Sequence, residues 1–378
     1  MLYTSSGLDE RELAVLSDIE NLRQRLRNSL HEPRRWSGSL RRLAFARNIQ
    51  GSNSIEGYDA RLDDVAAVAL GEMPLDSSEE TRLALEGYRN AMTYVLQRAD
   101  DNDVECSVSL IKSLHFMMTG YSLLNRPGRW RAGPIYVLNE QTQAILHEGA
   151  PVDEVPGLMA DLASSINDSG DEELLVKAAM AHLNLVMIHP FRDGNGRMAR
   201  CLQSLVLARN GILSPVFMSI EEYLGRNTQA YYDVLANVGG GHWAPSANTR
   251  PWIRFTLTAH LRQAGTLRRR IDDAERLWLG LERLVGAREE RQLAALHDAA
   301  MGMRLRRATY LKIAAESGSE ISEQTAGRDL KTLADLGYLE PHGERRGRYY
   351  VATPVVRDVW LAIRGSRPIR DDTDPFSD

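Results

Sequence analysis

The stretch that decides the fold is HPFRDGNGR, residues 189–197, which gathers an imidazole, a carboxylate, a guanidinium and a Gly-Asn-Gly turn. Residues 174–188 before it read LLVKAAMAHLNLVMI, and residues 198–211 after it read MARCLQSLVLARNG. Both flanks carry apolar residues at the spacing of buried helices. The sequence therefore predicts a polar loop held between two helices, and so many functional groups in one loop indicate a chemical purpose.

The turn leads directly into the second helix. Gly194, Asn195 and Gly196 place unpaired backbone N–H groups at a helix N-terminus, where the helix dipole favours an anion. Glycine lets the backbone approach a phosphate without interference from a Cβ atom. Arg197 and Arg200 are three residues apart, so we expect both to reach the same side and donate to further phosphate oxygens. These residues together predict a polyphosphate site.

Two further side chains in the loop suggest a reaction. Asp193 offers a hard oxygen ligand of the kind that suits Mg²⁺ between phosphates. His189 has an intrinsic pKa of about 6.5, which suits it to take a proton from a hydroxyl group at neutral pH. The spacing matches neither the Walker A pattern nor the dinucleotide fingerprint. We therefore expect a phosphate site of another type, with a general base beside it.

The bulk composition sets limits on the class of protein. With 378 residues, 43% of them hydrophobic and 26% charged, the chain is long enough for one large globular domain and a smaller one. A net charge of -5 argues against a chain that binds nucleic acid over its whole surface. We see neither a secretory leader nor an apolar run of about 20 residues, so we expect a cytoplasmic protein that does not bind membranes.

Most of the first 280 residues show helical periodicity, but residues 126–151 break it. Pro and Gly residues there precede the β-forming run Ile135, Tyr136 and Val137, and a polar break separates this run from Ala144–Leu146. This pattern predicts a β-hairpin set into a helical domain. The expected fold class is therefore all-α with one hairpin insertion.

The C-terminal part has a different organisation. Two short helices within residues 307–339 are followed by a two-stranded ribbon with the polar tip GERRGR, the order of a winged helix-turn-helix. Its candidate nucleic-acid contacts are Gln324, Thr325, Arg328 and Lys331 on the second helix and Arg345, Arg346 and Arg348 at the tip. Because the basic excess is small, we favour a protein-contact module, with DNA binding as the alternative.

At this point a family resemblance becomes visible. HPFRDGNGRMAR, residues 189–200, resembles the complete motif of the Fic (filamentation induced by cAMP) family. GRWR and IYV within residues 128–137 are similar to the family's flap hairpin, and YYDVLANVG, residues 231–239, resembles its segment near the adenine. The resemblance implies a helical protein adenylyltransferase (AMPylator). Such an enzyme uses ATP and Mg²⁺ to transfer AMP to a protein Ser, Thr or Tyr hydroxyl and releases pyrophosphate.

The resemblance also assigns roles. It makes His189 the general base and Asp193 the Mg²⁺ ligand. The phosphates would be held by an anion hole, in which Asn195 also contacts phosphate, and by two arginines: Gly194, Asn195, Gly196, Arg197 and Arg200. The flap residues Ile135, Tyr136 and Val137 would dock the target chain by strand addition. Tyr232 and Asn237 would lie near the base, with helix packing as the alternative for Tyr231 and Tyr232.

A second stretch, SNSIEG at residues 52–57, resembles the family's inhibitory motif through Ser52, Glu56 and Gly57. In such proteins the glutamate pairs with the second motif arginine, here Arg200, and displaces the γ-phosphate. A guanidinium can fork onto one carboxylate or onto phosphate oxygens, not both. We therefore expect inhibition in cis, the alternative being that Glu56 is a surface residue before a capping glycine.

These interpretations divide the chain as follows: an N-terminal helical segment at 1–38, an inhibitory helix region at 39–60, a catalytic core at 61–265 with the flap at 126–151, a connecting helix at 266–300, a winged helix at 301–365 and a disordered acidic tail at 366–378. Three other functions stay open: a nucleotide-sensing transcriptional regulator, transfer of another nucleotide, and removal of AMP. The expected partner is a protein target, and self-modification and a homodimer also remain open.

Overall fold

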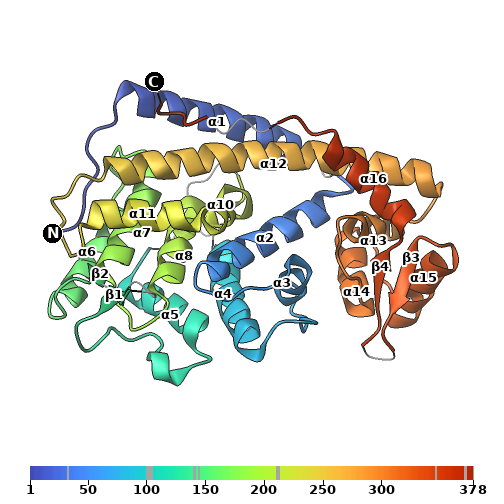
Figure 1. The fold of residues 1–378 in the computed structure, drawn as a ribbon, viewed down its shortest axis with the longest axis horizontal. Helices are drawn as coiled ribbons and strands as arrows, with labels where there is room; N and C mark the ends of the chain where they lie inside the picture. Colours follow the sequence, from blue (N-terminus) through green and yellow to red (C-terminus); the bar gives the residue numbers. More distant parts are fainter. Residues whose placement is uncertain are drawn as a thin grey trace.

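The computed structural model describes residues 1–31, 34–98, 105–138, 142–143, 145–209, 213–344, 347–369 and 373–377. The described part is mainly helical and contains two small antiparallel sheets, β1–β2 and β3–β4 (Figure 1). The expected helical fold with a hairpin insertion is therefore confirmed. None of its helices is both long enough and apolar enough to cross a membrane.

The hairpin and the helices that precede the loop at residue 189 have these bounds: α1 Glu10–His31, α2 Ser37–Ser54, α3 Leu62–Ala69, α4 Glu79–Arg98, α5 Val108–Thr119, the 3₁₀ turn η1 Leu123–Asn125, β1 Tyr136–Leu138, β2 Ile145–Glu148, α6 Val155–Asn167 and α7 Leu174–Ile188. The elements after it are α8 Asn195–Arg209, α9 Pro215–Met218, α10 Glu221–Arg226, α11 Thr228–Gly239, α12 Arg250–Val285, α13 Glu290–Ala300, α14 Arg307–Glu316, α15 Glu323–Asp335, β3 Leu339–His342, β4 Tyr349–Ala352 and α16 Pro354–Gly365.

Helices α7 and α8, which flank the loop at residue 189, pack along each other. Twelve of the fifteen residues of α7 are buried, because apolar side chains surround it on almost every side. Helix α8 is buried to a similar extent. The loop between these helices is thus anchored at both ends in the core, which fixes the position of its polar groups.

Helix α12 spans the molecule and contacts elements from both ends of the chain, including α1, α7, α11 and α16 (Figure 1). Its 36 residues extend over about 54 Å. The expected connecting helix at 266–300 is therefore wrong as a single element. The apolar spacing that begins at Trp252 continues through Leu267 and Leu281, and Gly286, with φ of +68°, ends the helix before α13 begins.

Helices α14 and α15 precede the ribbon β3–β4, in the order that the sequence predicts for residues 301–365. Ser322 caps α15 by accepting a hydrogen bond from the backbone of Thr325. Arg345 and Arg346 lie outside the described residues, so the expected wing tip is only partly seen. The winged-helix assignment stays a prediction.

The acidic tail makes contacts that the sequence interpretation did not anticipate. Arg254 lies 5.1 Å from the ring centre of Phe376, and Arg262 donates to the backbone carbonyl of Thr373. The C-terminus lies beside α1 (Figure 1). Disorder is therefore the wrong expectation for the described part of the tail, because arginines of α12 pair with its carbonyl and aromatic groups.

Candidate active site

A cavity of about 430 Å³ brings together the loop, the hairpin, α11 and the end of the α2 segment. Residues from the sequence prediction that line it are Glu56, Ile135, Tyr136, Val137, His189, Asp193, Gly194, Asn195, Gly196, Arg200 and Tyr232. Segments far apart in the chain thus meet at one pocket. The expected hairpin borders it: Tyr136 pairs with Glu148 and Val137 with His147. Of the expected second strand, Ala144 lies outside the described residues.

His189 occupies an uncommon backbone conformation at the end of α7. Its φ is +53°, in the left-handed region that costs free energy for a residue with a Cβ. The buried guanidinium of Arg131 holds this turn: its Nε donates to the His189 carbonyl at 2.8 Å, Nη1 donates to the Gly133 carbonyl at 2.8 Å, and Nη2 donates to Ala150. Arg131 thereby ties the base of the flap to the loop and is a positioning residue.

The imidazole of His189 has a defined tautomer. Its Nδ1 lies 3.1 Å from the carbonyl oxygen of Val186, which can only accept, so Nδ1 carries the hydrogen. Burial lowers the pKa of His189 to about 4; the nearby Arg131 and His147 lower it as well, while Val186 and the Glu56 carboxylate oppose them. The ring is neutral at pH 7 and has a lone pair on Nε2. It can therefore accept a proton.

Asp193 is oriented by two residues that the sequence did not suggest. Asn125 Nδ2 donates to Asp193 Oδ2 at 2.8 Å. His115 accepts from the Gly128 backbone at Nδ1, so its Nε2 donates to the Asp193 carbonyl at 2.9 Å, and its ring stacks on Phe191. Burial lowers the pKa of His115 to about 4, which keeps this ring neutral as well. The Asp193 side chain is 38% exposed and so stays accessible from the pocket.

The Asn195 side chain does not have the orientation expected for phosphate contact. Its Oδ1 accepts from the Phe191 backbone N–H and its Nδ2 donates to the Phe191 carbonyl, each at 2.9 Å. This pair of hydrogen bonds closes the loop, and Asn195 is buried. In this structure the Asn195 side chain therefore closes the loop and does not face a phosphate, which corrects the expected role. The backbone N–H groups of Asn195 and Gly196, in the first turn of α8, remain suited to an anion.

The two motif arginines of α8, Arg197 and Arg200, have different surroundings. Arg197 is fully buried and does not line the cavity; its guanidinium lies 5.2 Å from the Tyr58 ring centre and donates to Tyr121 at 3.3 Å and to Asp193 at 3.4 Å. Its Nε is buried without a hydrogen-bond partner among the described residues. Of these two residues, Arg200 lines the cavity. The expectation that both arginines face the pocket thus holds for Arg200 and not for Arg197.

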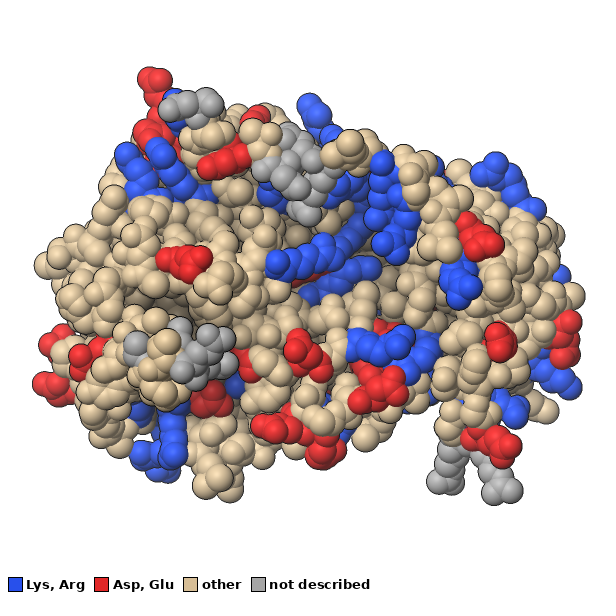
Figure 2. Space-filling model, viewed as in Figure 1, with Lys and Arg blue, Asp and Glu red and all other residues tan. Residues whose placement is uncertain are grey.

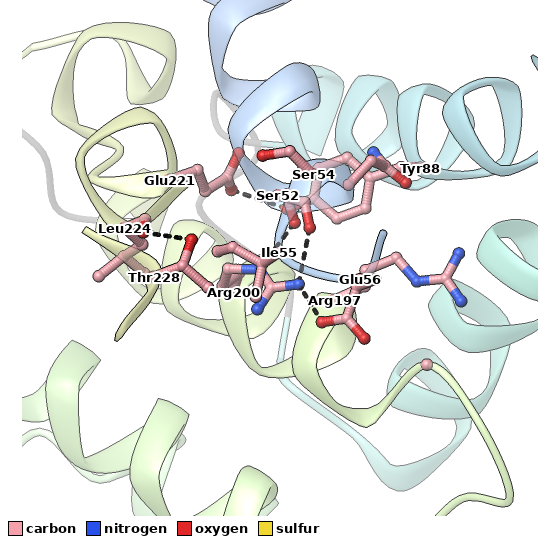
Figure 3. A network of polar contacts seen from close by, with 12 residues as sticks. Ser52, Ser54, Ile55, Glu56, Tyr88, Arg197, Arg200, Glu221, Leu224 and Thr228 are labelled. Carbon is pink, nitrogen blue, oxygen red and sulfur yellow. Dashed lines mark hydrogen bonds and ion pairs between the residues drawn. The ribbon is translucent and has the colours of Figure 1, made fainter. Parts of the chain in front are cut away.

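Arg200 is held by residues of the segment 52–57. Figure 3 shows Ser52 and Glu56 converging on its guanidinium. Nε donates to Ser52 Oγ at 2.8 Å, and Nη2 donates to the Ser52 carbonyl at 2.8 Å and to Glu56 Oε1 at 2.6 Å. Burial favours a raised pKa for Glu56, but Arg200 and Arg197 outweigh it and hold the pKa of this carboxyl below its usual value. The pair is therefore ionised at neutral pH.

The carboxylate of Glu56 lies directly over the turn that precedes α8. A Cβ atom at Gly196 would collide with Glu56 Oε1 and would lie 3.2 Å from Arg200 Nη1. The absence of a side chain at residue 196 therefore leaves the space that the carboxylate fills. Glu56 consequently takes the position where an anion would meet both Arg200 and the helix N-terminus.

Close packing of α2 places Ser52 and Glu56. Gly51 faces the backbone of Glu221 on α10, where a Cβ atom would collide with the Glu221 carbonyl group. After α2 ends at Ser54, Gly57 has a φ of +82°, a conformation that glycine adopts readily. The Tyr232 hydroxyl donates to the Ile55 carbonyl at 3.0 Å. These contacts explain why the stretch needs glycine at residues 51 and 57.

The segment expected near the adenine is only partly at the pocket. Tyr231 also borders the cavity but is largely buried, and its hydroxyl lies 2.9 Å from His182 Nε2, as the packing alternative expects. Tyr232 lines the cavity, whereas Asn237 is exposed and does not line it. The expectation for Asn237 is therefore wrong, because it lies on the outward side of α11. His147 from β2 lines the pocket, and no signal in the sequence distinguished it.

Comparison with known proteins agrees with this architecture. Residues 105–207 match the Fic/DOC family. The chain is similar to Protein adenylyltransferase Fic of Nematostella vectensis, with 29% identity over 277 residues that cover 67% of this chain and 58% of that protein. It is also similar to the protein of the same name from Drosophila willistoni, with 28% identity over 255 residues that cover 66% of this chain and 46% of that protein.

Among solved structures, a Fic family protein from Desulfovibrio desulfuricans G20 aligns with a TM-score of 0.59 and 22% identity, over 93% of this chain and 99% of that chain. Fic-1 from C. elegans aligns with a TM-score of 0.55 and 22% identity, over 68% of this chain and 71% of that chain. The match to the Fic/DOC family lies within residues 105–207. It spans about half the length of the curated relatives it matches.

Proposed function

We propose that this protein is a protein adenylyltransferase, which transfers AMP from ATP to a Ser, Thr or Tyr hydroxyl of a protein and releases pyrophosphate. One observation carries the proposal: a neutral imidazole with a lone pair on Nε2 borders the same cavity as the N-terminus of α8 and the buried cation Arg200. A base beside an anion site is the combination that hydroxyl attack on a phosphate requires. The names of the curated relatives support the same reaction.

The proposed reaction is an in-line displacement at the α-phosphorus. His189 Nε2 takes the proton of the target hydroxyl while its oxygen forms a bond to the α-phosphorus. The bond between that phosphorus and the bridging oxygen breaks, and pyrophosphate leaves with the electron pair. The α8 N-terminus and Arg200 would stabilise the charge on the phosphates. Arg131 contributes by fixing the turn that carries the imidazole.

The residues at the pocket fit a magnesium ion that is shared with a nucleotide. Within the described residues no cluster of three or more His, Cys, Asp or Glu could hold a metal. Mg²⁺ in phosphate-transfer sites commonly uses one or two carboxylates together with substrate phosphates, and Asp193 supplies one accessible carboxylate. We propose that Asp193 holds Mg²⁺, which would neutralise phosphate charge when bound.

We propose that Glu56 inhibits this reaction within the same chain. Its carboxylate pairs with Arg200 and lies against Gly196, where it would exclude the outermost phosphate of ATP. Ser52 adds two hydrogen bonds that hold the guanidinium in place. Release of Glu56 would therefore leave Arg200 already oriented toward the phosphate.

The flap supports a role in docking the target. Tyr136, Leu138 and Ile145 are large hydrophobic side chains with 44%, 43% and 57% of their surface exposed, and their strands border the pocket. An extended segment of the target could add to an edge of this hairpin, which would bring its hydroxyl to His189. Strand addition depends on the backbone conformation of the target more than on its sequence, so the hairpin does not identify the target protein.

The test is intact-mass spectrometry of the Glu56→Gly protein incubated with Mg²⁺ and, separately, ATP, GTP, CTP or UTP. We expect a mass gain of one AMP with ATP alone, on the chain itself or on an added protein target, and no gain after the further change His189→Ala. Modification by another nucleotide would redirect the proposal to that donor. Undiminished modification without the imidazole would refute it.

We also propose that residues 301–365 are a winged-helix unit that contacts protein. Helix α15 packs its apolar side inward through Ala326, Leu330 and Leu333. A gel-shift assay of the full chain at low salt is expected to show no DNA binding. A shift that Arg328→Ala with Lys331→Ala abolishes would instead assign α15 to DNA.

A further inference from the structure

A second cavity lies between α2, α12, α13 and α16. Its volume is about 470 Å³, similar to that of the catalytic pocket, and the two cavities share no lining residue. In Figure 2, Lys and Arg side chains gather over the hollow between α2 and α12. The arginines that line the cavity come from four helices or the segment after α16: Arg47, Arg226, Arg269, Arg270, Arg364 and Arg367.

The carboxylates nearby do not balance this charge. Glu222 accepts from both terminal nitrogens of Arg270 at 2.5 and 2.6 Å, from Arg226 at 2.5 Å and from Gln263 at 3.1 Å. A carboxylate offers about four acceptor positions, so these contacts saturate it. Arg47 approaches Glu222 only to 4.0 Å. Asp273, the acidic residue in the cavity wall, is paired with Arg367 at 2.6 Å.

The pKa of Arg47 reflects both its burial and the excess of positive charge around it. Burial, followed by repulsion from Arg270, lowers the pKa of Arg47 to about 9, and the Glu222 carboxylate opposes the shift without cancelling it. An arginine normally keeps its charge far above neutral pH. A guanidinium among like charges is stabilised by an anion, and the cleft has room for one.

Apolar side chains also line the cavity: Leu40 and Leu43 of α2 and Trp360 of α16, whose ring centre lies 5.1 Å from the guanidinium of Arg367. His297 also lines it, and its buried Nε2 has no hydrogen-bond partner among the described residues. A site with convergent charged groups, one free polar atom and an apolar wall is typical of a small-ligand pocket, and the volume lies in the usual range of about 300–1,000 Å³.

We propose that this cleft binds a phosphorylated small molecule, with its phosphate groups among the arginines of α12 and α16 and its uncharged part against Trp360 and α2. Guanidinium groups fork onto phosphate oxygens, and several of them suit a ligand with more than one negative charge. The volume of the cavity suits a small molecule and not a nucleic-acid duplex. The site is independent of the catalytic reaction proposed above.

Hydrogen–deuterium exchange of the full chain at low ionic strength tests this site, with inorganic pyrophosphate as the probe. The catalytic pocket also attracts phosphate, so peptides from α16 and α12 report on the cleft while peptides from α8 report on the loop. The cleft variant is Arg269→Gln with Arg364→Gln; the Arg269 side chain is half-buried and the Arg364 side chain is exposed, so neither change removes a core side chain. The matched control is Arg268→Gln with Arg357→Gln, exposed residues of the same two helices outside the cavity.

We expect pyrophosphate to protect α16 and α12 in the wild type and in the control. In the cleft variant the apparent affinity should fall about tenfold or more, as expected from losing charge-assisted hydrogen bonds. Protection confined to α8, or an equal loss in the control, would overturn the site. Citrate, a carboxylate polyanion, should protect less than pyrophosphate; the reverse order would overturn the phosphate assignment. Phenyl phosphate should act at lower concentration than inorganic phosphate, and the opposite result would exclude the apolar wall from binding.

Discussion

Removal of the Glu56 carboxylate should activate the protein by an amount that the pair geometry allows us to calculate. ATP must replace the charge-assisted hydrogen bond between Arg200 Nη2 and Glu56 Oε1, whose length is 2.6 Å. Such bonds contribute about 1.5–3 kcal/mol. Since one tenfold change corresponds to about 1.4 kcal/mol, Glu56→Gly should raise modification at subsaturating ATP by about 10- to 150-fold. Arg200 keeps both bonds to Ser52, so little reorganisation opposes this gain.

The assay is the initial rate of AMP incorporation, followed by intact-mass spectrometry at several ATP concentrations. Glu56→Asp is the matched control, because it keeps the charge but shortens the side chain by one carbon, about 1.5 Å. Its rate should lie between those of the wild type and Glu56→Gly. Circular dichroism verifies that each variant is folded. Equal rates for the wild type and Glu56→Gly, or a faster rate for the Asp variant than for the Gly variant, would refute the competition between carboxylate and phosphate.

Three other predictions concern the support around the pocket. In the Glu56→Gly background, Arg131→Ala should lower kcat by about 100-fold with little change in the KM for ATP. The reason is that Arg131 holds the His189 turn, and a displacement of about 1 Å costs about that much in rate. A change in KM alone would contradict a positioning role. Gly57→Ala should destabilise the fold by about 1–2 kcal/mol, measured by urea unfolding, and raise AMP incorporation, since its φ of +82° strains an L-residue; unchanged stability would contradict that strain. The free energy of unfolding should fall between pH 7.5 and pH 5.5 by about 1.4 kcal/mol for each of His115, His182 and His189. Their pKa values are lowered to about 4, 3 and 4 in the folded state, so the unfolded chain takes up more protons below pH 6.5 and stability is lost as the pH falls. If a His182→Gln variant kept the full pH dependence, the contribution assigned to His182 would be wrong.

Some of the site could be predicted because its groups are close in sequence. The loop at 189–200 follows one helix and begins the next, so local spacing alone brings His189, Gly196 and Arg200 to one pocket. The partner of Arg200 lies far away in the chain, and only the resemblance of the SNSIEG stretch pointed to Glu56. The hairpin was visible because its Pro, Gly and β-branched residues interrupt a long helical pattern.

Other features depend on tertiary geometry that spacing does not reveal. Arg131 belongs to the GRWR stretch, but the carbonyl groups of His189, Ala150 and Ile188 become its neighbours only after folding. Asn195 was misassigned because an amide can close its own loop as well as contact a ligand. The expected boundary at residue 266 falls inside α12, because the charge-rich sequence there suggests a separate connecting helix. In the structure those charges lie on the helix surface, while Leu267 and Leu281 continue its buried side.

The missing side chain at residue 196 constrains how this protein can change. A methyl group there would evict the Glu56 carboxylate, yet it would also occupy the space beside Arg200 that a nucleotide would need. A substitution of Gly196 would therefore displace the Glu56 carboxylate and hinder nucleotide binding at the same time. A variant that gains activity and still binds the nucleotide would instead have to change the α2 segment, which carries Glu56. Under the proposed competition between Glu56 and phosphate, that segment is where regulation can diverge while the chemistry is preserved.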